Sequence, residues 1–426
     1  MIMIGAVADD FTGGTDVAVF FRRSGLRTII VFGPPEADAE LPEHDALVVA
    51  LKTRTIDPDK AVAESLAAAA WLRNSGADQI FFKYCSTFDS TPAGNIGPVA
   101  DALADDLGAG IAVVVPASPA HGRTQYLGHL FVHQQLLSDS PMRHHPLTPM
   151  TNPRVAEVMA SQTDRPVALI ALPIVRAGAA AIRAELDRLQ ADGARYAVVD
   201  AVDDTDLTQI GHACLGDRLV TGAAGLAGGL GAALTAGATL TADEADPVGD
   251  VPTAVLAGSC SARTLEQIAH LQRSQPSFRL DAVVTPDDEA LAEDALRFYD
   301  QQPRGSAPLI YSSLPPAELQ AVQQALGGGR AAAILEGAMG LIARGLIARG
   351  VRRLIVAGGE TSGSVVSALG VDGGLIGEEA APGVPWIFTT DHNPMALLLK
   401  SGNFGEPSLL TDATHAGQTS RVDAHA

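Results

Sequence analysis

Cysteine is scarce in this sequence. Cys85, Cys214 and Cys260 are its three cysteines, an odd number with no CxxC spacing. Disulfide frameworks and structural zinc sites both require more cysteines at closer spacing. The sequence therefore argues against either kind of site and predicts reduced, buried thiols.

Long apolar runs and basic clusters are also missing. No segment approaches the roughly 20 consecutive apolar residues of a membrane span, and the N-terminus lacks the basic and then apolar layout of a signal peptide. Only 29 Lys and Arg oppose 49 Asp and Glu, and the resulting net charge of −20 would repel nucleic acid and anionic lipid. We therefore expect a cytoplasmic protein with no nucleic acid and no membrane as partner.

The length and composition indicate two domains. A chain of 426 residues exceeds the size at which one hydrophobic core stops growing, and 47% hydrophobic residues can fill two cores. Residues 235–252 contain few large apolar side chains and four acidic ones, as is typical of a linker. The sequence predicts domains over residues 1–240 and 251–412, followed by a flexible tail over residues 413–426.

The fold class follows from the alternation of apolar runs and helical segments. A strand over residues 2–8, a helix over 15–24 and a strand over 27–32 form a βαβ unit, and this rhythm continues along the chain. In the second half we expect strands at 254–257, 282–284, 309–312 and 353–357. Continuous apolar strands are typical of parallel sheets covered on both faces by helices. We therefore predict two α/β domains with largely parallel sheets and the active site in the cleft between them.

Two aspartates follow the first predicted strand, where ligands bind in parallel sheets. Asp9 and Asp10 precede Thr12 and the pair Gly13 and Gly14, whose backbone N–H groups could approach a ligand. The alternative is structural, because Asp10 or Thr12 could simply cap the helix that follows.

A second polar group follows the strand that ends near Tyr84. It combines Lys83 and Asp89 with several hydroxyls, among them those of Ser86 and Thr87. This density suits a small polyhydroxylated anion, with the lysine facing a carboxylate and the hydroxyls and aspartate holding sugar oxygens. A Ser/Thr-rich capping loop remains the alternative.

Glycine and serine turns recur in the second half of the chain. The run from Gly358 through Gly359, Glu360, Thr361 and Ser362 follows a strand and begins a helix, which presents free N–H donors to phosphate. Further turns contain Ser259 and the pair Lys400 and Gly402. The sequence has neither a Walker A loop nor GxGxxG. Three such turns together favour a nucleotide, although each alone could be an ordinary loop.

The histidines raise a metal hypothesis that the sequence does not favour. His129 and His133 are four residues apart and His144 and His145 follow, but HExxH is absent and all four fall in an irregular segment. We expect no metal site of the protein's own, and Mg²⁺ only as a companion of ATP, which needs few protein ligands.

Several long motifs resemble those of the four-carbon acid sugar kinases, and within that family the branch that acts on 3-oxo-tetronate. The resemblance rests on IGAVADDFTGGTD, VVALKTRT, FFKYCSTFDSTPAGNIGPVADAL, GHLFV, HPLTPM, VLAGSCSA, VAGGETSGSVVSALGV, PGVPW and LLLKSGNFG. These motifs run in family order from residue 4 to about 405. The resemblance implies an N-terminal domain that binds the acid sugar, a C-terminal domain that binds ATP, and phosphoryl transfer to the terminal hydroxyl.

The resemblance also implies roles for individual residues. Those implied for the acid sugar are Asp9, Asp10, Thr12, Arg54, Lys83, Ser86, Thr87 and Asp89, and those for ATP are Ser259, Gly358, Gly359, Glu360, Thr361, Ser362, Lys400 and Gly402. We favour Asp10 over its neighbour Asp9 as the base that accepts the proton of the attacking hydroxyl, although adjacent carboxylates titrate as a pair.

Three alternatives stay open at this point. A kinase for threonate or erythronate would differ only in its acceptor, and a ligand-sensing protein would bind sugar acid and nucleotide without chemistry. A homo-oligomer is compatible with the sequence, as is a monomer.

Overall fold

The computed structural model describes residues 3–33, 41–144, 148–236, 246–390 and 393–417. By its internal contacts the chain divides into two compact units, Met1–Asp243 and Glu244–Ala426. The division falls in the segment where the sequence predicts the linker, although residues 237–245 lie outside the described residues. The end of the predicted tail, residues 418–426, lies outside them too.

Unit 1 contains a parallel sheet in the order β2-β3-β1-β4-β11-β5-β10-β9. Its strands are β1 Ile4–Ala8, β2 Thr28–Phe32, β3 Ala46–Ala50, β4 Gln79–Lys83, β5 Ala112–Val115, β9 Val167–Ile170, β10 Tyr196–Val199 and β11 Leu219–Gly222. The central strands are buried along their whole length, because helices cover both faces of the sheet.

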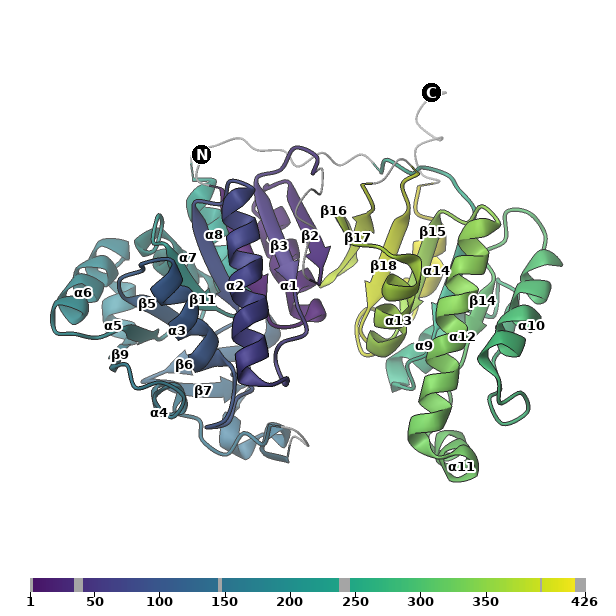
Figure 1. The fold of residues 1–426 in the computed structure, drawn as a ribbon, viewed down its shortest axis with the longest axis horizontal. Helices are drawn as coiled ribbons and strands as arrows, with labels where there is room; N and C mark the ends of the chain where they lie inside the picture. The colour runs from purple at the N-terminus through teal and green to yellow at the C-terminus, as the bar shows by residue number, and fades with distance from the viewer. Residues whose placement is uncertain (1–2, 34–40, 145–147, 237–245, 391–392, 418–426) are drawn as a thin grey trace. The chain divides into compact units, whose positions relative to one another are not determined.

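The helices of unit 1 form two layers (Figure 1). One layer contains α1, which packs against α8, while α8 contacts α7 and α7 contacts α6; the other contains α2, α3 and α4. The helices are α1 Phe11–Arg23, α2 Pro58–Asn74, α3 Ile96–Asp106, α4 Val155–Ala160, α5 Leu172–Arg176, α6 Ala179–Ala191, α7 Asp204–Ala213 and α8 Ala224–Leu234.

The irregular segment after β5 contains a small antiparallel sheet. Its strands are β6 Arg123–Tyr126, β7 His129–Val132 and β8 Gln135–Leu136, and short 3-10 helices η1 Pro119–His121, η2 Leu137–Asp139 and η3 Pro141–His144 flank them. The sequence predicts no elements here, because these strands are too short to show a hydrophobic period.

Unit 2 has a mixed sheet in the order β13-β14-β12-β15-β18-β17-β16. The first five are parallel, and β17 and β16 add an antiparallel edge. The strands are β12 Thr253–Ala257, β13 Ser277–Arg279, β14 Leu309–Tyr311, β15 Arg353–Ala357, β16 Gly373–Ala381, β17 Val384–Phe388 and β18 Ala396–Lys400.

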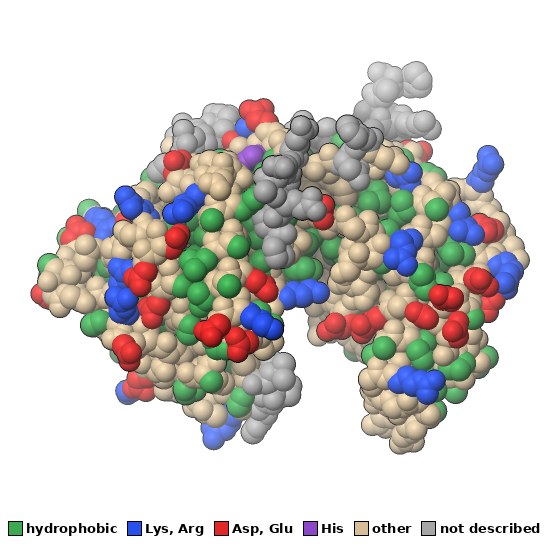
Figure 2. Space-filling model, viewed as in Figure 1, with side chains coloured by type: hydrophobic (Ala, Val, Ile, Leu, Met, Phe, Trp, Pro, Cys, Tyr) green, Lys and Arg blue, Asp and Glu red, His purple; other side chains and the backbone are tan. Residues whose placement is uncertain are grey.

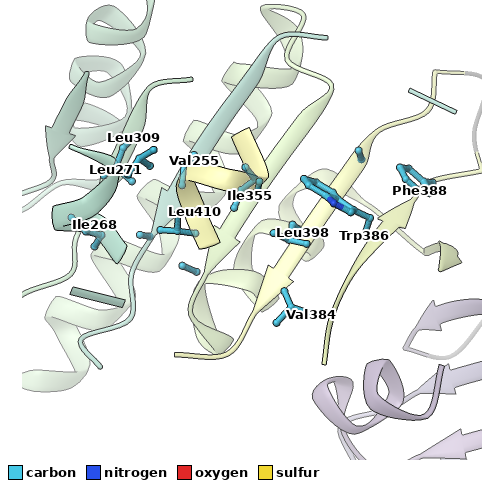
Figure 3. Close-up of a cluster of buried hydrophobic side chains, with 14 residues drawn as sticks. Val255, Ile268, Leu271, Leu309, Ile355, Val384, Trp386, Phe388, Leu398 and Leu410 are labelled. Carbon is cyan, nitrogen blue, oxygen red and sulfur yellow. The ribbon is translucent and has the colours of Figure 1, made fainter. Parts of the chain in front are cut away.

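The helices of unit 2 again cover both faces of its sheet. On one face α13 packs against β15 and β18 and also contacts α12; on the other, α14 contacts β12 and β15 and packs on α9. Side chains such as Val255, Ile355, Leu398 and Trp386 form a core row across neighbouring strands (Figure 3). The helices are α9 Ala262–Leu271, α10 Asp288–Asp300, α11 Pro316–Leu326, α12 Gly328–Ala348, α13 Gly359–Leu369 and α14 Leu409–Thr414.

Helix α12 is, among the described residues, the one helix long and apolar enough to cross a membrane. It also carries Arg330, Glu336 and Arg344, and it packs against α10, α11 and α13. These contacts are those of a helix in a folded domain.

The prediction of two α/β domains with largely parallel sheets is confirmed, and three local predictions change. Helix α1 begins at Phe11 rather than at residue 15, because Asp10 caps it. The strand predicted at 282–284 is wrong: the Asp281 carboxylate accepts hydrogen bonds from the N–H groups of Val283 and Val284, which makes a turn. Helix α14 includes residues 413 and 414, which the sequence analysis placed in the tail.

Candidate active site

The predicted sugar-site residues of unit 1 come together at the carboxyl edge of its sheet. Asp9 follows β1, Lys83 ends β4 and Arg54 lies in the loop after β3, and these three strands are neighbours in the order β3-β1-β4. The backbone fixes this arrangement, since the N–H of Asp9 donates to Lys83 O at 3.1 Å and the N–H of Thr53 donates to Asp9 O at 2.9 Å.

Four charged side chains form a network at this edge. Arg54 donates to both oxygens of Asp9, from Nε to Oδ2 and from Nη2 to Oδ1, each at 2.8 Å. Arg54 Nη2 also lies 2.7 Å from Asp10 Oδ1. Lys83 Nζ lies 2.9 Å from the same Asp10 oxygen and 3.7 Å from Asp9 Oδ1. Each cation therefore contacts both aspartates, and Lys83 is only 4% exposed.

The glycine pair after the aspartates makes this network possible. A Cβ on Gly13 would clash with the ammonium group and Cε of Lys83, and a Cβ on Gly14 would lie 2.5 Å from that of Ala50. The N–H of Gly13 donates to Asp10 Oδ1 at 3.0 Å, so Asp10 is the N-cap of α1. The capping interpretation is thus confirmed, and the glycines admit Lys83 and β3 instead of leaving space for a ligand.

The network keeps Asp10 ionised. Burial alone would raise the pKa of Asp10, but the nearby charges of Lys83 and Arg54, with their hydrogen bonds, outweigh it and lower the pKa to about 2. At neutral pH Asp10 is a carboxylate that already has three hydrogen-bonding or charged neighbours.

Asp16 is a further carboxyl group beside this network, and the sequence did not single it out. It lies one helical turn after Gly13 on α1, and no hydrogen bond or ion pair joins it to another described residue. Burial raises the pKa of Asp16 to about 6 and the Asp10 charge adds to this, while Lys83, Arg23 and Arg54 oppose it. The spacing of three residues from Gly13, inside a motif already singled out, was the signal that could have found it.

The hydroxyl-rich loop after β4 is ordered by its own hydrogen bonds. Thr87 is buried and donates to Asp89, and Phe88 holds a left-handed backbone at φ 51°, which is unusual for a bulky residue. Ser86 and Asp89 stay partly exposed and Thr12 is exposed. The side chains open to a ligand are therefore Ser86, Asp89 and Thr12, whereas Thr87 positions Asp89.

The glycine and serine turns of unit 2 meet at the carboxyl edge of its sheet. The N–H groups of Gly258 and Ser259 donate to Ala357 O, and the N–H of Gly358 donates to Lys400 O at 2.9 Å. A Cβ on Gly402 would lie 2.5 Å from Ser259 Oγ. The predicted nucleotide-site residues of β12, β15 and β18 are therefore neighbours.

Helix α13 begins at this edge with free backbone donors. Its N-cap is Gly358, at φ 132°, and no side chain caps it. A Cβ on Gly359 would meet nothing within 4 Å, and Ser362 Oγ is buried without a hydrogen-bond partner. The end of an uncapped helix, with open space before it, fits a phosphate group. Thr361 lies against Gly258, and Glu360 is exposed in the first turn.

Lys400 makes its hydrogen bonds within unit 2. It is buried, and its ammonium group donates to Thr264 Oγ1 at 3.0 Å and to Gly402 O at 3.1 Å. Burial lowers the pKa of Lys400 to about 8, with a smaller effect from Arg263. In the structure Lys400 holds the Gly402 turn in place.

A small cavity lies at the same edge of unit 2. The cavity, of about 190 Å³, is lined by Leu280, Val283, Ser312, Leu335 and others.

Within the part of the chain that the structure describes, no group of three or more His, Cys, Asp or Glu could hold a metal ion. His129 Nε2 accepts a hydrogen bond from Arg154 Nε at 3.2 Å.

Comparisons with known proteins match both units. A family model described as a sugar-binding N-terminal domain matches residues 4–230, and one described as a nucleotide-binding C-terminal domain matches residues 254–410. The 3-oxo-tetronate kinase of Burkholderia multivorans is 48% identical over 97% of both chains, and that of Cupriavidus necator is 47% identical over 96% of both. A crystal structure from Salmonella typhimurium LT2, provisionally named a tRNA synthase, superposes with a TM-score of 0.90 at 41% identity and covers 97% of this chain and 99% of its own.

The charge network predicts a pH-dependent loss of stability in Lys83→Met. Breaking a buried ion pair costs on the order of 3 kcal/mol at pH 7. Because the pKa of Asp10 is lowered in the folded state, the ion pairs stabilise the fold above its unfolded pKa of about 4, and this contribution disappears as the pH falls toward 2. Chemical denaturation of wild type and Lys83→Met at several pH values measures this difference in the free energy of unfolding.

The exposed Lys60→Met on α2 is the matched control and should change stability by less than about 0.5 kcal/mol. A Lys83→Met variant as stable as wild type at pH 7 would contradict the network.

Proposed function

The chain belongs to the 3-oxo-tetronate kinase family, and from this premise we propose that it transfers the γ-phosphoryl group of ATP to the terminal hydroxyl of 3-oxo-tetronate. The observation that carries the proposal is the uncapped N-terminus of α13 among the turns of unit 2, because it supplies the phosphate site that a kinase needs. Unit 1 supplies the charged strand edge at which an acid sugar can be oriented.

ATP binding is proposed at the carboxyl edge of the unit 2 sheet. The phosphates would accept hydrogen bonds from the backbone at the start of α13 and from the turn hydroxyls, and the base would enter the cavity beside Ser312. Mg²⁺ would come with the nucleotide, held mainly by phosphate oxygens and water. The residues proposed for this site are Ser259, Gly358, Gly359, Glu360, Thr361, Ser362 and Gly402, with Lys400 positioning the last.

Acid sugar binding is proposed at the carboxyl edge of the unit 1 sheet. Ser86, Asp89 and Thr12 offer hydrogen bonds to the substrate oxygens. Arg54 and Lys83 hold the two aspartates in fixed positions, so that charge is preorganised before substrate arrives. Because these charged side chains are already in place, they need little rearrangement during phosphoryl transfer.

The proton of the attacking hydroxyl has two candidate acceptors, Asp10 and Asp16. The sequence favours Asp10, which is already hydrogen-bonded to Gly13 and paired with Lys83 and Arg54. Asp16 has no such partner and its pKa of about 6 is closer to neutrality, which makes it the stronger base. We therefore propose Asp16 as the acceptor and Asp10 as the residue that positions Lys83 and the start of α1.

The two candidates predict different pH profiles. If Asp16 is the base, kcat should rise with pH through about 6, where Asp16 loses its proton, and Asp16→Asn should lower kcat by about 10²- to 10⁴-fold. Asp10→Asn should mainly lower stability. Steady-state kinetics from pH 5 to 8 on both variants make the comparison. A flat profile below pH 7, with kcat lost only in Asp10→Asn, would identify Asp10 instead.

The phosphate site predicts opposite effects on stability and on ATP binding in Gly359→Asp. A carboxylate in the first turn of a helix stabilises it by about 0.3–1 kcal/mol, but it repels the phosphates that we place there. The KM for ATP should rise by about tenfold or more while the melting temperature holds or rises.

Gly329→Asp is the matched control, because Gly329 also lies in the first turn of a helix without a side-chain cap and its Cβ would meet nothing within 4 Å. It should leave the KM for ATP unchanged. An equal KM in wild type and Gly359→Asp would remove α13 from the nucleotide site.

A coupled assay for ADP release over 3-oxo-tetronate, threonate and erythronate tests the proposed activity. We expect the highest kcat/KM for 3-oxo-tetronate; preference for threonate or erythronate would reassign the acceptor. Binding of sugar acid and ATP without ADP formation would support a sensing protein instead.

The remaining assignments concern partners and location. On the face drawn in Figure 2, acidic side chains are interspersed with basic ones and no extended basic patch is visible, which agrees with a small-molecule substrate rather than nucleic acid. We propose a cytoplasmic enzyme whose partners are the acid sugar and ATP.

A further inference from the structure

Arg123 is a cation without an acidic partner in an acidic protein. It begins β6, directly after the turn that follows β5, and its Nη1 donates to the backbone oxygen of His121. Its Nε is buried without a hydrogen-bond partner, and among the described residues no carboxylate lies within ion-pair distance of it. An arginine left in this state offers a planar pair of donors to an anionic ligand.

His121 lies beside Arg123 and in the same positive field. Its Nδ1 is 2.9 Å from Ser118 Oγ, which leaves Nε2 as the ring nitrogen without a bond to a described residue. Burial lowers the pKa of His121, and the charges of Arg123, Arg23 and Lys83 lower it further, against Asp204 alone. The charges of three cations and one carboxylate therefore act on this imidazole.

Helix α1 links this place to the network around Asp10. Gly13, Asp16 and Phe20 occupy one face of the helix at spacings of three and four residues. Gly13 lies against the Lys83 ammonium group, while the Phe20 ring packs edge-on against His121 with centroids 6.0 Å apart. Asp16 thus lies between Lys83 and His121 along α1.

The spacing along α1 is comparable with the length of a four-carbon acid. Asp16 and Phe20 are four residues apart, which corresponds to a rise of about 6 Å. An extended four-carbon chain is about 5 Å long. A substrate whose carboxylate lies beside His121 and Arg123 would therefore have its terminal hydroxyl near Asp16.

Lys83 and Arg54 are less suitable for the substrate carboxylate, although the sequence favours them. Both already contact Asp9 and Asp10, and a further carboxylate there would face those two charges. We propose that Arg123, assisted by His121, binds the carboxylate of the substrate and so makes the enzyme select acids over neutral sugars. This inference rests on the proposed kinase function and specifies its substrate site.

The test compares an acid with its neutral analogue. In erythrulose a CH₂OH group replaces the carboxylate of 3-oxo-tetronate, so a residue that binds only the carboxylate affects one substrate and not the other. Arg123→Met should lower kcat/KM for 3-oxo-tetronate by about 10- to 150-fold, the effect expected for hydrogen bonds to a charged group. The value for erythrulose and the KM for ATP should stay within about twofold of wild type.

Two further variants control for structure. Arg165→Met removes an exposed arginine that pairs with Asp105 and should change neither substrate. Arg123→Lys, which keeps the charge but loses the planar pair of donors, should recover part of the loss. If Arg123→Met does not fold, Arg123→Lys provides the test through the ratio of its kcat/KM for 3-oxo-tetronate to its kcat/KM for erythrulose.

The results separate this inference from the proposed function. Equal losses for acid and neutral substrates, or no loss for the acid, would overturn the assignment of Arg123. If wild type releases no ADP with any acceptor, the kinase proposal fails by itself. Calorimetry of 3-oxo-tetronate with wild type and Arg123→Met then decides: weaker binding in the variant supports the carboxylate site, and equal binding or none in wild type overturns it.

Discussion

The structure of the strand edge in unit 1 depends on placing two adjacent carboxylates at the end of a buried strand. Asp9 and Asp10 would be costly there without compensation, because burial disfavours their charged forms. Lys83 and Arg54 compensate them from the two strands on either side of β1, and Lys83 fits only because residue 13 has no side chain. The sequence motif, the strand order and the glycine pair thus meet one requirement together, which is to neutralise two buried carboxylates.

The two units present different groups at the carboxyl edges of their sheets. Unit 1 has paired charged side chains at its strand ends, whereas unit 2 has backbone N–H groups at the start of α13 and hydroxyls in its turns, with Lys400 fixing a loop. Such groups act locally, and this matters in a chain whose net charge of −20 repels anions. Arg123 has no carboxylate within ion-pair distance among the described residues and a buried Nε without a partner, so its charge is available to an anionic ligand.

The sequence predicted the architecture well because continuous apolar strands, helical periods and turns at strand ends are local patterns. It also singled out Asp9, Asp10 and Lys83, because polar residues that follow buried parallel strands lie at one edge of the sheet, and the family resemblance added Arg54. The structure brings these four side chains together. The sequence could not show that Lys83 faces the aspartates, because the contact joins residues 73 positions apart. Asp16 was missed although its spacing from Gly13 was visible, because an aspartate within a helix is usually a solvated residue. The sequence could not show that Arg123 lacks an acidic partner, because this depends on its neighbours in the fold. The antiparallel strands β16 and β17 escaped notice because their alternation is weak.

Phosphorus NMR of the reaction product tests the central claim most directly, because it reports both transfer and position. Incubation of the enzyme with MgATP and 3-oxo-tetronate should give a new phosphomonoester resonance that proton coupling splits into a triplet, as expected for a phosphate on the methylene oxygen of carbon 4. Only inorganic phosphate beside ADP would contradict phosphoryl transfer to the sugar. A doublet, from a phosphate on the carbon 2 hydroxyl, would contradict the assigned orientation of the substrate between Arg123 and Asp16.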